Sequence, residues 1–195
     1  GKAYFATKDR PHGFFAPNLN PETGKRFRAG KGYLYEGGLK IPYLVRWPGK
    51  IKPGSVSDHL FYHPDVMPSL AELTNAECPK TDGISFLPTL LSRGKQEDHS
   101  HMYWELGRQR ALRKGDWKAY RDKKGNWELY DLSTDIEEQM DLADKEGNIL
   151  QDLIALAESS HQPARLGKII NQALVDKDRR EAPHERNLQF KKSKK

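Results

Sequence analysis

Residues 30–54 read GKGYLYEGGLKIPYLVRWPGKIKPG, and they are the most informative stretch of the chain. They place Lys31 between two glycines, directly ahead of a Tyr-Glu-Gly-Gly turn and a short apolar run. Glycine permits tight backbone turns and close approach of a ligand, and a lysine ammonium on its flexible stem is a suitable point charge for sulfate or phosphate. Taken alone, the pattern indicates either an anion site at the start of a strand or a solvated turn.

The stretch closely resembles the sulfatase family, the formylglycine-dependent sulfuric ester hydrolases related to alkaline phosphatase. Further segments resemble the family in the same order along the chain, at residues 57–73, 82–94, 102–105, 111–122 and 127–144. The resemblance therefore runs from about residue 30 to residue 145 without a large gap. Collinear matches of this kind are more specific than any single motif.

The resemblance implies an α/β fold, and we divide the chain into three parts. Residues 1–98 correspond to the end of a sulfatase/alkaline-phosphatase-like catalytic domain. Residues 99–164 correspond to a C-terminal subdomain in which a small antiparallel sheet is packed by a helix, and residues 165–195 form a basic tail. In the family, such an enzyme hydrolyses sulfate esters, with calcium holding the sulfate and formylglycine attacking sulfur.

Five residues are candidates for contact with a substrate. Lys31 matches the family lysine that contacts the sulfate, which implies that it binds a sulfate oxygen and stabilises charge on the bridging oxygen. Trp104 and Glu105 match a neighbourhood near the family's substrate pocket. His12 and Arg28 lie in a loop-like region rich in proline and glycine, and such loops often line active sites. His12 either reaches that pocket or is a surface histidine, and Arg28 either extends the anion site or faces water.

The family's nucleophile motif has no counterpart in this chain. Formylglycine arises from a cysteine or serine in a Cys/Ser-x-Pro-x-Arg motif, whereas Cys78 stands in CPKT, which lacks the spacing to proline and the arginine. We interpret Cys78 as a loop or packing residue. The paired aspartates that hold calcium in the family are also missing, so we expect the calcium ligands to lie outside this chain. We therefore expect the C-terminal part of a longer enzyme that is inactive by itself, because covalent catalysis fails without its nucleophile.

Hydrophobic patterning predicts the local structure. Residues 41–47 (IPYLVRW) predict a strand whose short apolar run suits a covered sheet. Short helices are expected to begin after Asp65 and after Ser85. Both residues are good N-caps, and the proline that follows each is tolerated in the first turn of a helix. Residues 101–132 predict an antiparallel meander with one apolar face that needs a cover. Residues 148–161 predict an amphipathic helix for that face, capped by its first residue.

Three polar residues receive a structural interpretation. Glu36 is expected to support the Tyr-Glu-Gly-Gly turn by hydrogen bonding rather than to act as an acid or base. His99 and His101 have the spacing that puts two side chains on one face of a strand, as zinc sites use. No third or fourth ligand is evident beside them, so we do not predict a zinc site.

The net charge of +6 is concentrated in the tail. Residues 165–195 contain 10 Lys and Arg but 4 Asp and Glu, whereas residues 1–164 contain 23 of each kind. Such a tail is typically solvated, and with few aromatic residues we predict no nucleic-acid binding. The positive charge of the tail could by the same electrostatics attract a sulfated polysaccharide, and this alternative stays open. No apolar run approaches the roughly 20 residues that span a bilayer, and the resemblance implies a periplasmic or secreted enzyme acting on a sulfate ester.

Three alternatives to a sulfatase stay open at this level. The first is another hydrolase of the same superfamily that acts on phosphate esters or phosphonates. The second is a non-catalytic module that binds sulfated glycans and keeps the anion site without the chemistry. The third is an interaction protein that acts through its basic tail.

Overall fold

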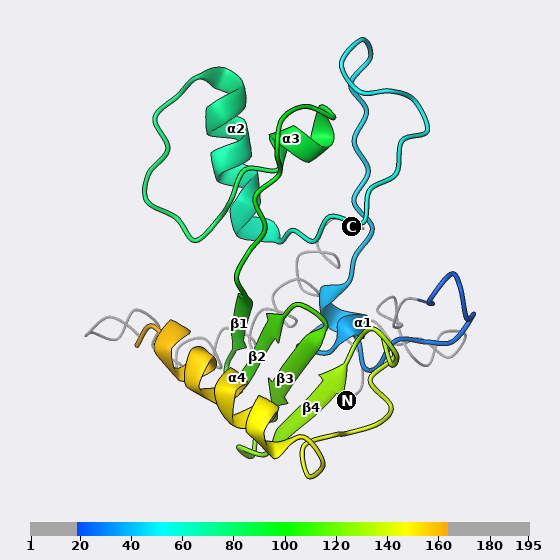
Figure 1. Ribbon diagram of the computed structural model, residues 1–195, viewed down its shortest axis with the longest axis vertical. Helices are drawn as coiled ribbons and strands as arrows, with labels where there is room; N and C mark the ends of the chain where they lie inside the picture. The colour runs from blue at the N-terminus through cyan, green and yellow to red at the C-terminus, as the bar shows by residue number, and fades with distance from the viewer. Residues whose placement is uncertain (1–18, 164–195) are drawn as a thin grey trace, which may run out of the picture. The chain divides into compact units, whose positions relative to one another are not determined.

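The computed structural model describes residues 19–163, which form a four-stranded sheet and several helices (Figure 1). The elements in chain order are α1 (Glu36–Leu39), the 3-10 helix η1 (His63–Asp65), α2 (Val66–Thr74), α3 (Leu87–Leu90), β1 (Met102–Leu106), β2 (Gln109–Lys114), β3 (Trp117–Arg121), β4 (Trp127–Asp131) and α4 (Gly147–Ser160). These described elements all belong to one compact unit of the chain, Gly1–Ser160.

The four strands form the antiparallel meander that the sequence predicts. They lie in the order β1-β2-β3-β4, so each strand pairs with its neighbour in the chain. The turn between β3 and β4 is fixed by Asp122, whose Oδ1 accepts hydrogen bonds from the backbone N–H groups of Lys124, Gly125 and Asn126 at 2.8, 2.7 and 2.9 Å. These bonds favour the charged carboxylate and lower the pKa of Asp122. The predicted subdomain therefore rests on local hairpins.

Helix α4 covers one face of the sheet, as predicted, and contacts β2 and β3 (Figure 1). The residues that meet in this layer are Leu150, Leu153 and Ala157 from the helix and Leu112, Ala119 and Leu129 from the strands. The three helix residues recur at helical spacing, and the three strand residues are neighbours across the ladder. The helix begins at Gly147, so Asn148 lies inside its first turn and is not the cap that the sequence suggested.

The opposite face of the sheet is also buried, because residues 28–39 pack against it. We call this segment the lysine segment, since it contains Lys31 as well as α1. The cluster on this side consists of Leu34 and Tyr35 from the lysine segment and Ala111, Tyr120, Tyr130 and Leu132 from the sheet and its end. The sheet is therefore the middle layer between α4 and the lysine segment. The sequence indicated one covered face, and the structure shows two.

Asp65 organises the region around α2 in a way that differs from the predicted helix cap. It precedes α2, but its side chain makes no capping bond to that helix. Its carboxylate instead accepts N–H bonds from Tyr62 at 2.9 Å and from Ile84 at 2.8 Å. His99 Nε2 lies 2.8 Å from the same carboxylate. Asp65 is 1% exposed, so it joins three backbone segments rather than ending one helix.

The strand predicted at residues 41–47 is not formed. A strand requires a partner for its backbone N–H and C=O groups, and no strand of the described region pairs with this run. Its apolar side chains are correspondingly open, with Ile41 73% and Leu44 93% exposed. The prediction was wrong for this structure, because an apolar run alone does not supply a pairing partner.

Leu153→Ala tests the layer between α4 and the sheet. Leu153 is 2% exposed, so truncation should leave a cavity and lower the free energy of unfolding by about 2 to 5 kcal/mol. Urea unfolding of the chain measures this loss. The matched control is Leu106→Ala, since Leu106 is 45% exposed. An equal loss in both variants would contradict the packing of α4 on the sheet.

Candidate active site

Lys31 lies in a tight turn immediately before α1. The turn is closed by the Tyr33 N–H, which donates to the Gly30 carbonyl at 3.1 Å. Gly32 has a φ of +94°, a region that favours glycine. Lys31 is exposed at this turn. The turn at the exposed Lys31 therefore depends on the backbone conformation of Gly32.

The two glycines of the Tyr-Glu-Gly-Gly sequence let α1 lie directly against the turn. The Gly37 N–H donates to the Arg28 carbonyl at 3.0 Å. A Cβ atom at Gly37 would overlap that same carbonyl oxygen, and a Cβ atom at Gly38 would overlap the Tyr33 carbonyl oxygen. Only residues without a side chain fit both places, so these glycines serve close backbone approach. The turn and α1 form one folded unit.

A buried ionic cluster fixes α1 to the sheet. Lys118 on β3 is 0% exposed, and its Nζ lies 2.7 Å from Glu36 Oε1 and 2.8 Å from Glu138 Oε1. The Glu36 N–H also donates to Glu138 Oε2 at 2.6 Å. Glu36 therefore supports the turn through a salt bridge and a backbone bond, in agreement with its predicted structural role.

The cluster places two carboxylates around one lysine, and this environment shifts the pKa of Glu138. Burial raises the pKa of the Glu138 carboxyl, while Lys118 opposes that rise. Glu138 also has a φ of +56°, which is uncommon for a residue with a side chain. Strain of this kind persists only where the surroundings hold it, and here the two contacts to Lys118 and Glu36 do so.

Arg28 is bound within the protein by groups on β4 and the lysine segment. Its guanidinium donates to the Tyr130 hydroxyl and, at 2.9 Å, to the Glu138 carbonyl. It lies 3.4 Å from the Glu128 carboxylate and 4.3 Å from the centre of the Tyr35 ring. Its side chain is 35% exposed. Both terminal nitrogens of the guanidinium thus contact protein groups. The contact of Arg28 with a substrate anion stays a prediction.

Gln109 connects the sheet to the lysine turn. It is the first residue of β2 and is 1% exposed. Its Nε2 donates to the Gly32 carbonyl at 3.0 Å, and its Oε1 accepts from the Tyr120 hydroxyl at 2.8 Å. Burial raises the pKa of Tyr120 to about 12, so this hydroxyl keeps its proton at neutral pH. No pattern in the sequence indicated this contact.

The structure separates the other predicted substrate residues. Trp104 packs against the cluster that includes the lysine segment, and its ring centre lies 5.8 Å from that of Tyr62. Glu105, the next residue on β1, lies on the α4 side by strand alternation, and its Oε1 is 3.4 Å from Arg110 Nε. Trp104 therefore shares a face with the lysine segment, whereas Glu105 does not. His12 lies outside the described residues.

The two histidines of the His-x-His pair contact different partners. His99 meets Asp65, whereas His101 Nε2 lies 2.9 Å from the Ser160 hydroxyl at the end of α4. Within residues 19–163, no three His, Cys, Asp or Glu side chains are gathered as a metal site would require. Calcium, whose ligands are expected outside this chain, stays a prediction.

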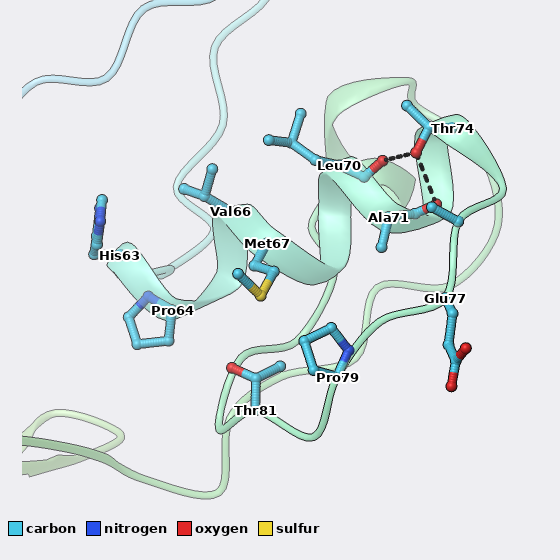
Figure 2. Close-up of a pocket in the computed structure, with 11 residues that line it drawn as sticks. His63, Pro64, Val66, Met67, Leu70, Ala71, Thr74, Glu77, Pro79 and Thr81 are labelled. Carbon is cyan, nitrogen blue, oxygen red and sulfur yellow. Dashed lines mark hydrogen bonds between the residues drawn. The ribbon is translucent and has the colours of Figure 1, made fainter.

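An apolar groove lies beside α2 (Figure 2). Its volume is about 740 Å³, and it is lined by His63, Pro64, Val66, Met67, Leu70, Ala71, Thr74, Ala76, Glu77, Pro79 and Thr81. Figure 2 shows the Thr74 hydroxyl turned back to the Leu70 and Ala71 carbonyls, at 2.8 and 3.4 Å. The lining is mainly apolar and includes none of the residues that surround Lys31.

Comparison with known proteins gives the family. Residues 28–158 match the family described as N-sulphoglucosamine sulphohydrolase, C-terminal. The chain belongs to the sulfatase family. An uncharacterized sulfatase of Schizosaccharomyces pombe is 37% identical over 145 residues, which make up 65% of this chain and 26% of that protein. An N-acetylgalactosamine-6-O-sulfatase of Bacteroides thetaiotaomicron is 31% identical over 151 residues, or 68% of this chain and 29% of the relative.

Solved structures agree with this sulfatase assignment. A structure from Bacteroides thetaiotaomicron, described in connection with the metabolism of multiple glycosaminoglycans, has a TM-score of 0.60 and 30% identity. The match covers 68% of this chain and 31% of that one. The chain thus spans less than a third of the length of each of these matched chains. The expected fold, a sulfatase C-terminal part with a small antiparallel sheet packed by a helix, is confirmed. Among the described helices, none is long and apolar enough to cross a membrane.

Lys118→Met tests the buried cluster of the sulfatase subdomain. Removing the ammonium leaves Glu36 and Glu138 buried without their cation, which should lower the free energy of unfolding by about 3 to 5 kcal/mol. Lys124→Met removes an exposed lysine and should change it by less than about 0.5 kcal/mol. Urea unfolding at neutral pH compares the two variants, and an equally small change in both would contradict the cluster's importance.

The loss caused by Lys118→Met should depend on pH. Without the lysine charge, burial raises the pKa of Glu138 further. A carboxyl whose pKa is higher in the folded than in the unfolded chain stabilises the fold at low pH, and this contribution is lost as the pH rises through the folded-state pKa. The difference from the unaltered chain should therefore be smaller near about pH 4.5, close to the ordinary range of a glutamate, than at about pH 7. A deficit that grows on acidification would be the opposite result.

Gly38→Ala tests the close packing of α1 on the lysine turn. The added methyl group overlaps the Tyr33 carbonyl, so the free energy of unfolding should fall by about 1 to 3 kcal/mol. Gly147→Ala is the matched control, since a Cβ there meets no atom within 4 Å. Urea unfolding gives both values, and hydrogen exchange at the Gly37 amide reports whether the turn has separated from α1. Equal effects of the two substitutions would refute this packing.

Proposed function

We propose that this chain is the C-terminal part of a sulfuric ester hydrolase and that Lys31 contacts the sulfate group during cleavage. The observation that carries the proposal is the exposed lysine on a glycine-bent turn, seated on a rigid sheet by Glu36 and Gln109. Membership of the sulfatase family supports the reaction class. Since the chain spans less than a third of the two named sulfatases it matches, the activity is proposed for a longer protein.

The role proposed for Lys31 is electrostatic. A sulfate ester gains negative charge on the bridging oxygen as its bond to sulfur breaks, and a positioned ammonium lowers the energy of that state. A lysine can approach two oxygens of a sulfate, since it is a compact charge with three donors. Glu36 cannot serve as a general base here without leaving Lys118, to which it is bound inside the protein. The chemistry contributed by this chain is therefore charge stabilisation.

The nucleophile and the metal are proposed to come from the remainder of the protein. Formylglycine would supply the attacking oxygen, and calcium would hold the sulfate, as the family resemblance implies. Residues 19–163 gather no ligand set for calcium, so the ion would be held by carboxylates elsewhere in the enzyme. A periplasmic or secreted location is part of the same proposal.

Sulfated sugars are the proposed substrate class. One relative carries the name N-acetylgalactosamine-6-O-sulfatase, and Trp104 offers an aromatic ring on the face of the lysine segment. Aromatic rings provide flat apolar surface with little conformational freedom to lose, which suits contact with a sugar ring. Comparing hydrolysis of sulfated sugars, an aryl sulfate and an aryl phosphate by the full-length protein tests the class. Faster phosphate than sulfate hydrolysis would favour the phosphatase alternative.

Lys31→Ala in the full-length protein tests the central role. Loss of one transition-state contact should lower kcat/KM for an aryl sulfate by about 100-fold or more. Lys124→Ala, which also removes an exposed lysine, should leave it unchanged. Initial rates at several substrate concentrations give both values. A loss of less than about threefold in Lys31→Ala would be too small for a residue that stabilises the transition state.

A further inference from the structure

Gln109 is a buried polar residue that the proposed chemistry does not use. Its side chain bonds at both ends, through Nε2 to the Gly32 carbonyl and through Oε1 to the Tyr120 hydroxyl. Gln109 is 1% exposed. Burying a polar group costs free energy unless the group is hydrogen-bonded, so an apolar residue would fill this position without that requirement. The bond to Gly32 connects β2 to the carbonyl of the residue that follows Lys31 in the chain.

The chemistry of the three groups fixes the orientation of the Gln109 amide. A carbonyl oxygen only accepts hydrogen bonds, whereas the amide of glutamine has one accepting and one donating end. If the amide were reversed, its oxygen would face the Gly32 carbonyl oxygen and the two acceptors would repel. The Tyr120 hydroxyl donates to the accepting end and so stabilises the orientation that directs Nε2 at Gly32. Gln109 is therefore a directed link between Tyr120 and the turn.

The Gly32 carbonyl is a sensitive place for such a link. Glycine has the widest choice of backbone conformations, and Gly32 occupies a φ of +94° with open space around its Cβ position. Because Gly32 has no side chain, no side-chain packing at this residue holds the turn in its conformation. The ionic cluster of Lys118 acts on Glu36, several residues later. A bond to the Gly32 carbonyl instead restrains the Gly32–Tyr33 peptide, one residue after Lys31.

We propose that Gln109 is a positioning residue for Lys31, with Tyr120 orienting its amide. The inference rests on the proposed contact between Lys31 and the sulfate group. Gln109 touches neither substrate nor reacting atoms; it holds the backbone from which the lysine extends. Misplacement of a catalytic group by about 1 Å can lower a rate by about 100-fold, so a backbone restraint one residue away has a measurable consequence.

The test is a double-mutant cycle of Gln109→Met and Lys31→Ala in the full-length protein. Methionine keeps the length and approximate volume of glutamine but makes no comparable hydrogen bond. Gln109→Met alone should lower kcat/KM for an aryl sulfate by about tenfold, and in the Lys31→Ala background it should cause no further loss. A merely structural residue would lower activity by the same factor in both backgrounds, and that result would overturn the proposal.

Gln96→Met is the matched control for the loss of a glutamine amide. The Gln96 amide bonds the Thr89 N–H and the Ser85 carbonyl, in the loops around α3. The Gln96→Met substitution should lower the thermal stability of the protein without changing kcat/KM. If Gln109→Met does not fold, Tyr120→Phe replaces it in the cycle, since it removes only the hydroxyl that orients the amide. Tyr120→Phe should lower kcat/KM by about threefold in the protein that keeps Lys31, and it should cause no further loss in the Lys31→Ala variant.

The outcomes separate the two proposals. If Lys31→Ala has no effect on kcat/KM, the role of Lys31 fails and the positioning role fails with it. If Lys31→Ala lowers kcat/KM strongly but Gln109→Met and Tyr120→Phe do not, the contact between Lys31 and sulfate stands and the positioning role of Gln109 is overturned. If Lys31→Ala and Gln109→Met each lower kcat/KM and the double variant loses no more than Lys31→Ala alone, both the sulfate contact of Lys31 and the positioning role of Gln109 are supported.

Discussion

The contact of the Lys118 ammonium with Glu36 and Glu138 is the constraint on which the rest of the structure depends. One cation and two carboxylates lie in a place without solvent, where removing a single partner leaves uncompensated charge. The three residues come from β3, from α1 and from the loop after β4, so their contacts close only when these segments meet. Burial raises the pKa of Glu138, which moderates the excess negative charge. The cluster therefore specifies one arrangement of the lysine segment on the sheet.

This constraint explains why the sheet is covered on both faces. An antiparallel meander with one helix would leave its second face in water, as many small sheets do. Here that face carries Ala111, Tyr120 and Tyr130, which pack against Leu34 and Tyr35. The C-terminal subdomain is thus the platform on which the lysine turn is built. Its stability and the position of Lys31 depend on the same buried groups, so loosening the platform displaces the proposed anion contact.

Sequence patterns predicted the elements that depend on local signals. Strand alternation and turn residues predicted the meander, and apolar residues at helical spacing, such as Leu150 and Leu153, predicted α4. They did not predict the burial of Lys118, because the patterns indicated only one apolar face of the meander and Lys118 alternates with Trp117 and Ala119. Its position on the same face as Tyr120 was the available signal for a buried lysine. The strand expected at residues 41–47 failed for the opposite reason, since pairing depends on a partner that a local pattern does not contain.

The site itself was predictable only in part, for a physical reason. Lys31 and its glycines are adjacent in sequence, and the family resemblance pointed to them directly. The residues that hold them, Gln109 and Lys118, are more than 70 positions away in the chain, and each is recognisable only by its burial. A flexible lysine gains directional effect only if its backbone is held, because its long side chain already has much conformational freedom. Under the proposed role of Lys31, its backbone is held by the distant buried polar residues Gln109 and Lys118, and single-sequence patterns rank such positions as ordinary surface positions.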